Sequence, residues 1–234
     1  VKRTYNAKKK IYYLNKALDQ RKDQSYFLYM LNQDTLKRLL FPLGRYTKDQ
    51  IREKANALEL LNANRPDSQE ICFVSRKSYR NFVESRMDDH DLRPGDIQHI
   101  NGTVLGQHHG IHNYTIGQRK GLNISYATPL YVLKIDDQTN TVIVGDKDSL
   151  KQHTISLHTF TTVSEQPLSN TRVEIKLRYL MTPIKGTVIQ SGDGQATLKL
   201  KSSHSFITPG QSCVLYKGDR ILGGGIIENQ ELVL

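Results

Sequence analysis

Apolar and polar positions follow different periods in the two halves of the chain. Up to about residue 92 the apolar residues form short runs or recur at helical spacing. From Arg93 onward they alternate with polar residues, and turn-forming dipeptides such as Pro94-Gly95 and Asn101-Gly102 separate the segments. The pattern therefore predicts an α+β chain whose second half is mostly β.

The first half is predicted to begin with one strand and two short helices. Residues 11–14 are aromatic and β-branched, which favours a strand. Asp23 is expected to cap a helix over residues 24–31, and residues 36–41 are expected to form a second helix that ends at Pro42.

Two further helices are predicted before the strands begin. Thr47-Lys48-Asp49-Gln50 has the spacing of a capping box and predicts a helix with one apolar face, formed by Ile51, Ala55 and Leu58. Residues 78–87 make the last helical stretch. Its inward-facing residues are expected to be Tyr79, Phe82 and Val83.

Short strands at close spacing predict a small antiparallel barrel at the C-terminal end. Apolar residues from Val173 to Tyr179 alternate with charged ones, and residues 186–190 and 196–201 flank a glycine turn typical of a hairpin. Cys213 falls in the apolar run 211–216 and is predicted to be core. A boundary is expected at 148–153, after a hairpin over residues 130–144.

Three glycine- or histidine-rich segments have structural interpretations. The histidines of residues 106–112 lack zinc-ligand spacing, so a loop with chance histidines is favoured. The basic loop 117–121 has no phosphate-loop context, and phosphate contact and domain packing both remain open. The triplet Gly223-Gly224-Gly225 indicates a tight bulge or a barrel corner.

Cys72 is the strongest candidate for a chemically reactive residue. It falls in a predicted strand of residues 71–74 that follows a polar loop. A free cysteine is usually a small core hydrophobe. A nucleophilic or sulfur-carrying thiol would need a pKa lowered by nearby positive charge. Arg65 and Arg76 are near in sequence, but Glu70 opposes them, so both interpretations stay open.

Composition narrows the class of protein. Thirty-three Lys and Arg residues against 23 Asp and Glu residues give a net charge of +10, which favours polyanionic partners. No apolar run approaches the ~20 residues of a membrane helix. Two cysteines do not make a disulfide framework or a metal pair. We therefore expect a reduced, cytoplasmic, soluble protein without a membrane partner.

Seven blocks of the chain together resemble the tRNA-specific 2-thiouridylases, which place sulfur on C2 of the wobble uridine. The blocks run in family order over essentially the whole chain. They are residues 22–28, 41–44, 67–73, 106–110, 114–122, 209–212 and 222–227.

The resemblance implies a domain plan. Family members carry an N-terminal ATP-pyrophosphatase domain with a phosphate loop and a first catalytic cysteine, and this chain is expected to start just after that part. Residues 1–76 would be the helical tail of this α/β nucleotide-binding domain, residues 77–150 a small central β domain, and residues 151–234 the barrel. ATP, with Mg²⁺ beside it, would be bound by the N-terminal domain and not by this chain, which alone should be inactive.

The resemblance also implies the chemistry. The cysteine that matches Cys72 carries a persulfide, ATP adenylates the uridine oxygen, and the first cysteine later forms a disulfide with the second. A persulfide is a strong nucleophile, and adenylation makes oxygen a leaving group. The sulfur would come from a donor protein, either a persulfide carrier or a cysteine desulfurase. The residues that match family tRNA contacts are Lys22, Asp23, Gln24, Arg178, Tyr179 and Gln211.

One departure from the family pattern is Leu130, which stands where members usually have tryptophan and is expected to lie within packing. The alternative function is an RNA-binding β-barrel module with a structural Cys72. A tRNA methyltransferase is disfavoured, because no glycine-rich nucleotide turn follows a strand.

Overall fold

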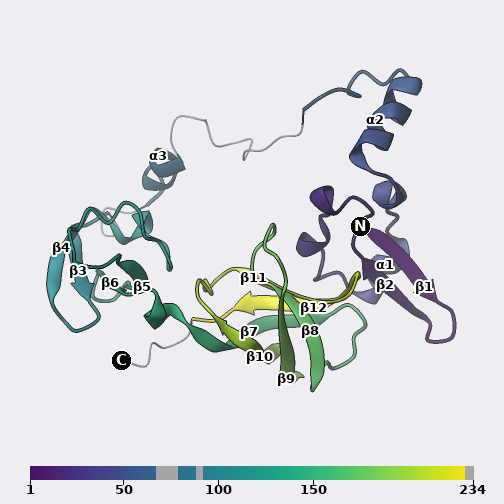
Figure 1. The fold of residues 1–234 in the computed structure, drawn as a ribbon. Coiled ribbons are helices and arrows are strands. Elements are labelled where there is room, and N and C mark those ends of the chain that lie inside the picture. The colour runs from purple at the N-terminus through teal and green to yellow at the C-terminus, as the bar shows by residue number, and fades with distance from the viewer. Residues whose placement is uncertain (67–78, 88–91, 230–234) are drawn as a thin grey trace. The chain divides into compact units, whose positions relative to one another are not determined.

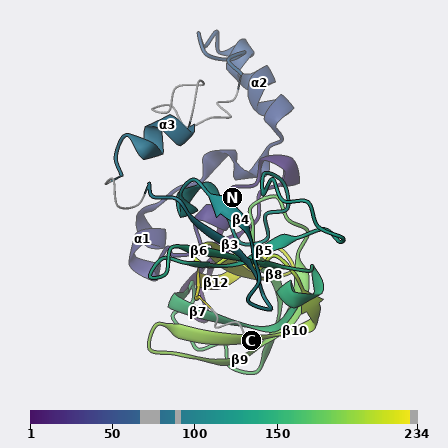
Figure 2. The same cartoon turned by 90° about the vertical axis from the view of Figure 1, so that its left-hand side faces the viewer.

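The computed structural model describes residues 1–66, 79–87 and 92–229. These residues divide into two compact units, which Figures 1 and 2 draw from two sides. The first unit combines Val1–Arg65, His153–Ser203 and Pro209–Asn229, and the second holds the described part of Pro66–Gln152 together with His204–Thr208. The α+β class with a mostly β second half is confirmed.

The first unit is built on a closed antiparallel barrel, as predicted (Figure 1). The order of its strands is β12-β11-β8-β9-β10-β7, and β7 pairs back onto β12. The strands are β7 (Gln152–Thr162), β8 (Thr171–Lys176), β9 (Ile184–Gly192), β10 (Gln195–His204), β11 (Ser212–Lys217) and β12 (Arg220–Ile227). The predicted hairpin is β9–β10, and the predicted alternation on β8 is confirmed by its buried Val173 and Ile175.

Glycines allow β12 to close the barrel. A Cβ on Gly223 would lie 2.1 Å from the carbonyl oxygen of Thr161 on β7, and the register of β12 against β7 shifts between Gly224 and Ile226. A side chain at Gly223 would therefore push two paired strands apart. This is the bulge that the glycine triplet predicted.

The N-terminal residues extend the barrel wall. The strand predicted over residues 11–14 forms as β2 (Ile11–Asn15) and pairs with β12. The unpredicted strand β1 (Lys2–Asn6) pairs with β2. Short turns and helices follow along the chain. They are η1 (Gln20–Lys22), η2 (Ser25–Phe27), α1 (Gln33–Arg38), η3 (Pro42–Arg45) and α2 (Lys48–Ala57).

The predicted helix over residues 24–31 is wrong. Only the single 3₁₀ turn η2 forms there, and Asp23 does not cap it, because the Asp23 carboxylate instead accepts hydrogen bonds from Ala17 N and Ser25 Oγ. The helix expected over residues 36–41 begins earlier, since Asn32 caps α1 through the backbone N–H of Thr35. It ends at Arg38, and Pro42 opens η3.

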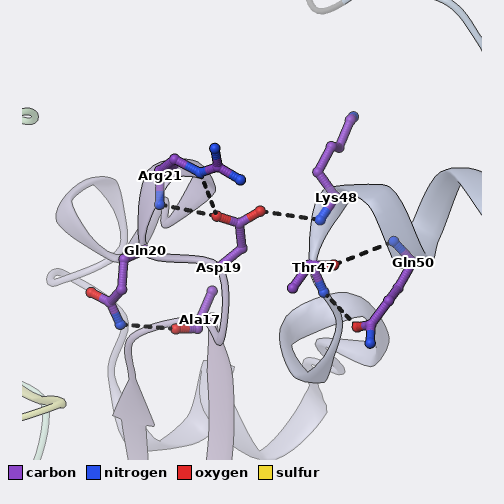
Figure 3. Close-up of polar contacts among 7 residues, drawn as sticks. All are labelled: Ala17, Asp19, Gln20, Arg21, Thr47, Lys48 and Gln50. Carbon is purple, nitrogen blue, oxygen red and sulfur yellow. Dashed lines mark hydrogen bonds and ion pairs between the residues drawn. The ribbon is translucent and has the colours of Figure 1, made fainter.

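The capping box of α2 is confirmed, with Thr47 and Gln50 bonded reciprocally (Figure 3). The apolar face expected for α2 is only half-buried at Ile51 and Ala55. The side chain of Leu58, the third residue of that face, is 71% exposed. The last predicted helix, α3, is shorter than expected and spans Tyr79–Glu84.

The second unit contains a four-stranded sheet in the order β4-β3-β6-β5. Its strands are β3 (Gly95–His99), β4 (Val104–His108), β5 (Tyr131–Asp136) and β6 (Thr141–Gly145). Strand β3 runs parallel to β6. The unit also contains two 3₁₀ turns, η4 (Ile111–Asn113) and η5 (Asp148–Leu150). The predicted hairpin of residues 130–144 is β5–β6. Leu130 is 6% exposed and packs with Ile97 and Val132, so its expected place within packing is confirmed.

Polar groups fix the histidine-rich segment and the basic loop; the first was predicted to be a loop, but its residues 106–108 form the end of β4. His108 is fully buried, and its Nε2 lies 3.0 Å from the carbonyl oxygen of Asn140, while its Nδ1 accepts the backbone N–H of Gly110. The basic loop is tied to β5, because Gly117 N donates to Val132 O and Val132 N donates to Gln118 O. Both segments thus stabilise the small sheet.

Candidate nucleic-acid interface

Asp19 fixes the turn that presents the first predicted contact residues (Figure 3). Its carboxylate accepts the backbone N–H groups of Arg21 and Lys48, both at 3.1 Å, and so joins η1 to the N-terminus of α2. These hydrogen bonds hold the pKa of Asp19 below its usual value, and the bond from Lys48 has the largest effect. The turn leaves Arg21 and Lys22 exposed.

Asp23 faces into the protein, unlike its neighbours Lys22 and Gln24, which are exposed. It is 5% exposed, and its two carboxylate oxygens accept from Ala17 N, at 2.8 Å, and from Ser25 Oγ. Ser25 Oγ lies 3.2 Å from the hydroxyl of Tyr216 on β11. The side chain of Asp23 therefore holds the loop against the barrel.

Tyr26 links this loop to the other predicted contacts. Its hydroxyl donates to the carbonyl oxygen of Ser212 at 2.6 Å, directly after Gln211, and its ring centroid lies 6.2 Å from that of Tyr179. Burial raises the pKa of Tyr26 from its ordinary value of 10 to about 12. Gln211 itself is held to β12, where its carbonyl oxygen accepts from Ile227 N.

An aromatic pair lies beside these residues, formed by the exposed Phe27 and the partly buried Tyr179. The ring centroids of Phe27 and Tyr179 are 4.8 Å apart, and Phe27 is 54% exposed. Arg178, which precedes Tyr179 after β8, is also exposed. Sequence reasoning did not single out Phe27, although it lies inside the block 22–28.

The segments 22–24, 178–179 and 211, far apart in the chain, are thus brought together around Tyr26. Cationic side chains beside exposed aromatic rings suit RNA, because the cations contact phosphates and the rings stack on unpaired bases. The roles of the individual residues remain a prediction.

The structure describes only one of the two cysteines. Cys213 is fully buried on β11, as predicted, and burial raises the pKa of its thiol, which stays protonated at neutral pH. Cys72 lies outside the described residues, as do Ile71, Phe73 and the rest of the block 67–73.

Two other kinds of site are not found in the part of the chain that the structure describes. No group of three or more His, Cys, Asp or Glu side chains is placed to hold a metal ion. Among these same residues, the helices are too short and too polar to cross a membrane.

Three family models together match most of the chain. They are described as a tRNA methyl transferase HUP domain (residues 1–76), a tRNA methyl transferase PRC-barrel domain (residues 80–146) and an aminomethyltransferase beta-barrel domain (residues 152–227).

Curated relatives carry one name. The tRNA-specific 2-thiouridylase MnmA of Acetivibrio thermocellus is 41% identical over 229 residues, which cover 96% of this chain and 63% of that protein. MnmA 1 of Caldanaerobacter subterraneus is 42% identical over 231 residues, covering 98% of this chain and 63% of the relative. The MnmA of a Synechococcus strain is 42% identical over 229 residues, covering 96% and 60%.

The closed antiparallel barrel and the separate four-stranded sheet place the chain among the α+β proteins with a β-barrel unit. The chain belongs to the family of tRNA-specific 2-thiouridylases. It spans about 63% of the length of the first of these relatives.

Proposed function

We propose that this chain forms the sulfur-carrying and tRNA-binding part of an enzyme that replaces the C2 oxygen of the wobble uridine with sulfur. The observation that supports it most is the gathering of segments 22–24, 178–179 and 211 around Tyr26, within a chain 41% identical to a 2-thiouridylase. tRNA is then the substrate, and the cytoplasm is the expected compartment.

In this proposal the reaction divides between two parts of the complete protein. ATP, bound with Mg²⁺ by the family's N-terminal domain, turns the C2 oxygen into a leaving group. The outer sulfur of a Cys72 persulfide forms the bond to C2, and AMP leaves with the oxygen. The sulfur–sulfur bond then breaks as a first cysteine forms a disulfide with Cys72. A thiol reductant first reduces this disulfide, and a donor protein, either a persulfide carrier or a cysteine desulfurase, then transfers sulfur to the freed Cys72 thiol and restores the persulfide.

The barrel surface binds and orients the tRNA in this scheme. Lys22 and Arg178 supply positive charge for phosphates, and Phe27 with Tyr179 offers aromatic rings to an unstacked base. Asp23 acts as a positioning residue, because its buried carboxylate holds the loop that carries Lys22 and Gln24.

The descriptions of two family models name methyl transfer, which makes it a second candidate reaction. The sequence contains no G-x-G-x-x-G segment of the kind that holds a nucleotide-like donor between a strand and a helix. Nucleoside mass spectrometry of tRNA treated with the complete protein separates the two reactions, since one product gains sulfur in place of oxygen and the other gains a methyl group.

The binding part of the proposal is tested by titrating this chain with fluorescent unmodified tRNA at several salt concentrations. Affinity should fall steeply with salt, and Arg178→Ala should weaken binding and reduce the salt slope by about one unit, because the variant neutralises one phosphate fewer. Arg38→Ala, at the exposed end of α1, is the matched control and should leave the slope unchanged. Binding that is undetectable at low salt, or insensitive to salt, would contradict the proposal.

A further inference from the structure

A second basic surface lies on the wall of the barrel formed by β8, β9 and β10. An open hollow of about 780 Å³ is lined there by five cationic side chains and a single carboxylate, Glu174. All five cations are exposed. We call this set the basic wall; it consists of Arg172, Lys185, Lys199, Lys201 and Lys217.

The strand register places four of these cations next to one another. Arg172 on β8 and Lys199 on β10 are both opposite Thr187 of β9. Lys185 is opposite Glu174, and because Leu200 pairs with Gly186, the register that continues into Lys201 brings it opposite Lys185. Directly opposed side chains share a face of the sheet. The charge concentration is thus built into the pairing of the strands.

The concentration of like charges on the basic wall lowers the stability of the sheet. Like charges directly opposite each other destabilise a sheet. None of the five cations forms an ion pair within 4.0 Å with another described residue. Residues chosen only for stability would place neutral or alternating charges here, so the surplus indicates a polyanionic partner.

The basic wall is separate from the residues gathered around Tyr26. Arg172 lies near the start of β8 and Arg178 lies beyond its end at Lys176, and the extended stretch from Arg172 to Lys176 alone spans roughly 13 Å. None of the residues predicted to contact tRNA lines the hollow. A partner that reaches both surfaces must therefore be an extended polyanion.

We propose that the basic wall is a second contact surface for the phosphate backbone of the same RNA that binds around Tyr26. This inference rests on the proposed function, because that function supplies an RNA long enough to span both surfaces. Arginine and lysine at this wall contact phosphates and position the RNA, without reading its bases.

The test uses the triple variant Lys185→Gln, Lys199→Gln, Lys201→Gln in the same titration of tRNA against salt. The salt slope should fall by about two to three units, at roughly 0.7–0.9 for each phosphate that is no longer neutralised, and affinity near 0.15 M salt should fall about tenfold or more. The thermal midpoint should change little, since the variant removes both the Lys185–Lys201 repulsion and the Lys185–Glu174 attraction.

The matched control is Lys8→Gln, Lys9→Gln, Lys10→Gln, which removes the same charge from an exposed turn between β1 and β2. It should leave the salt slope unchanged. An equal fall for both triple variants would overturn the proposal, because net charge alone would then explain binding. Stoichiometric binding of tripolyphosphate, abolished in the basic-wall variant while tRNA binding stays unchanged, would overturn it in favour of a small-anion site.

The outcomes also separate this inference from the proposed function. If the unsubstituted chain binds tRNA and Arg178→Ala weakens binding while the basic-wall variant does not, the basic wall is wrong and the surface around Tyr26 stands. If the basic-wall variant weakens binding and Arg178→Ala does not, the basic wall stands as an RNA contact and the surface around Tyr26 is wrong. If the unsubstituted chain binds no tRNA, both fail.

Discussion

The outer surface of the barrel has two contrasting sides. On β11, Val214 and Tyr216 share the face of Lys176 and Glu174, yet both are fully buried, because the N-terminal residues Leu14, Tyr26 and Tyr29 cover them. On β9 and β10 the outward positions include the exposed Lys185, Lys199 and Lys201, with no covering segment among the described residues. One wall of the barrel is thus used to build the unit, while the other remains available for a charged partner.

The contrast shows that an outward position on a strand can be core. The covered side contains a polar chain from Asp23 through Ser25 to Tyr216, all of it buried. Buried polar groups stabilise a fold only when their partners are present. The covered side should therefore be sensitive to substitution, and the basic wall should tolerate it.

The largest expected effect comes from emptying the covered side. Leu14→Ala removes a fully buried side chain and should lower the free energy of unfolding by about 2–5 kcal/mol, because transfer energy is forfeited and a cavity remains. Lys199→Ala on the basic wall should change it by less than about 0.5 kcal/mol. Urea unfolding of both variants measures the difference, and similar losses would show that the two sides do not differ as described.

A smaller loss is expected from breaking the polar chain. Asp23→Ala leaves Ala17 N and Ser25 Oγ without their acceptor and should lower the free energy of unfolding by about 1–3 kcal/mol. Asp137→Ala, at an exposed turn, is the control and should be close to neutral. If chemical denaturation gives equal midpoints for the two variants, Asp23 does not hold the loop in the way proposed.

The pH dependence of stability offers a finer distinction. Burial raises the pKa of Tyr26 and of Tyr216 to about 12, from an ordinary value of 10. Between those values the unfolded chain releases protons that the folded chain retains, so stability should fall as pH rises above about 10. Tyr216→Phe should make this decline shallower. Thermal midpoints between pH 8 and about pH 11 measure it, and an unchanged decline would mean that Tyr216 ionises freely in the folded protein.

Local sequence patterns predicted the strands of the barrel better than the N-terminal segment that covers one side of it. Alternation predicts the two faces of β8 correctly at Val173 and Ile175, but the strand ends at Lys176, and Tyr179, expected on the same face, follows in a turn and packs against Tyr26 and Phe27. On β11 the four residues from Cys213 to Tyr216 are all buried, and such a continuous apolar run indicates burial on both faces without naming the covering segment.

The interface could be predicted only in part, for a related reason. Resemblance singles out Lys22, Gln24, Arg178 and Gln211, but local spacing predicts a helix where the structure has the 3₁₀ turn that begins at Ser25. The turn depends on contacts between Ser25 and Tyr216, which are 191 residues apart in the chain. No local pattern encodes a contact at that separation, and the same limit hid the inward orientation of Asp23.

The central claim is that Cys72 carries the sulfur, and thiolation of tRNA by the complete protein tests it most directly. Mass spectrometry of tRNA nucleosides should show that Cys72→Ser forms no 2-thiouridine, although it still binds tRNA, because the persulfide has no other position. Cys213→Ala should still form 2-thiouridine, since the Cys213 thiol is buried and protonated. Continued formation of 2-thiouridine by Cys72→Ser would contradict the account.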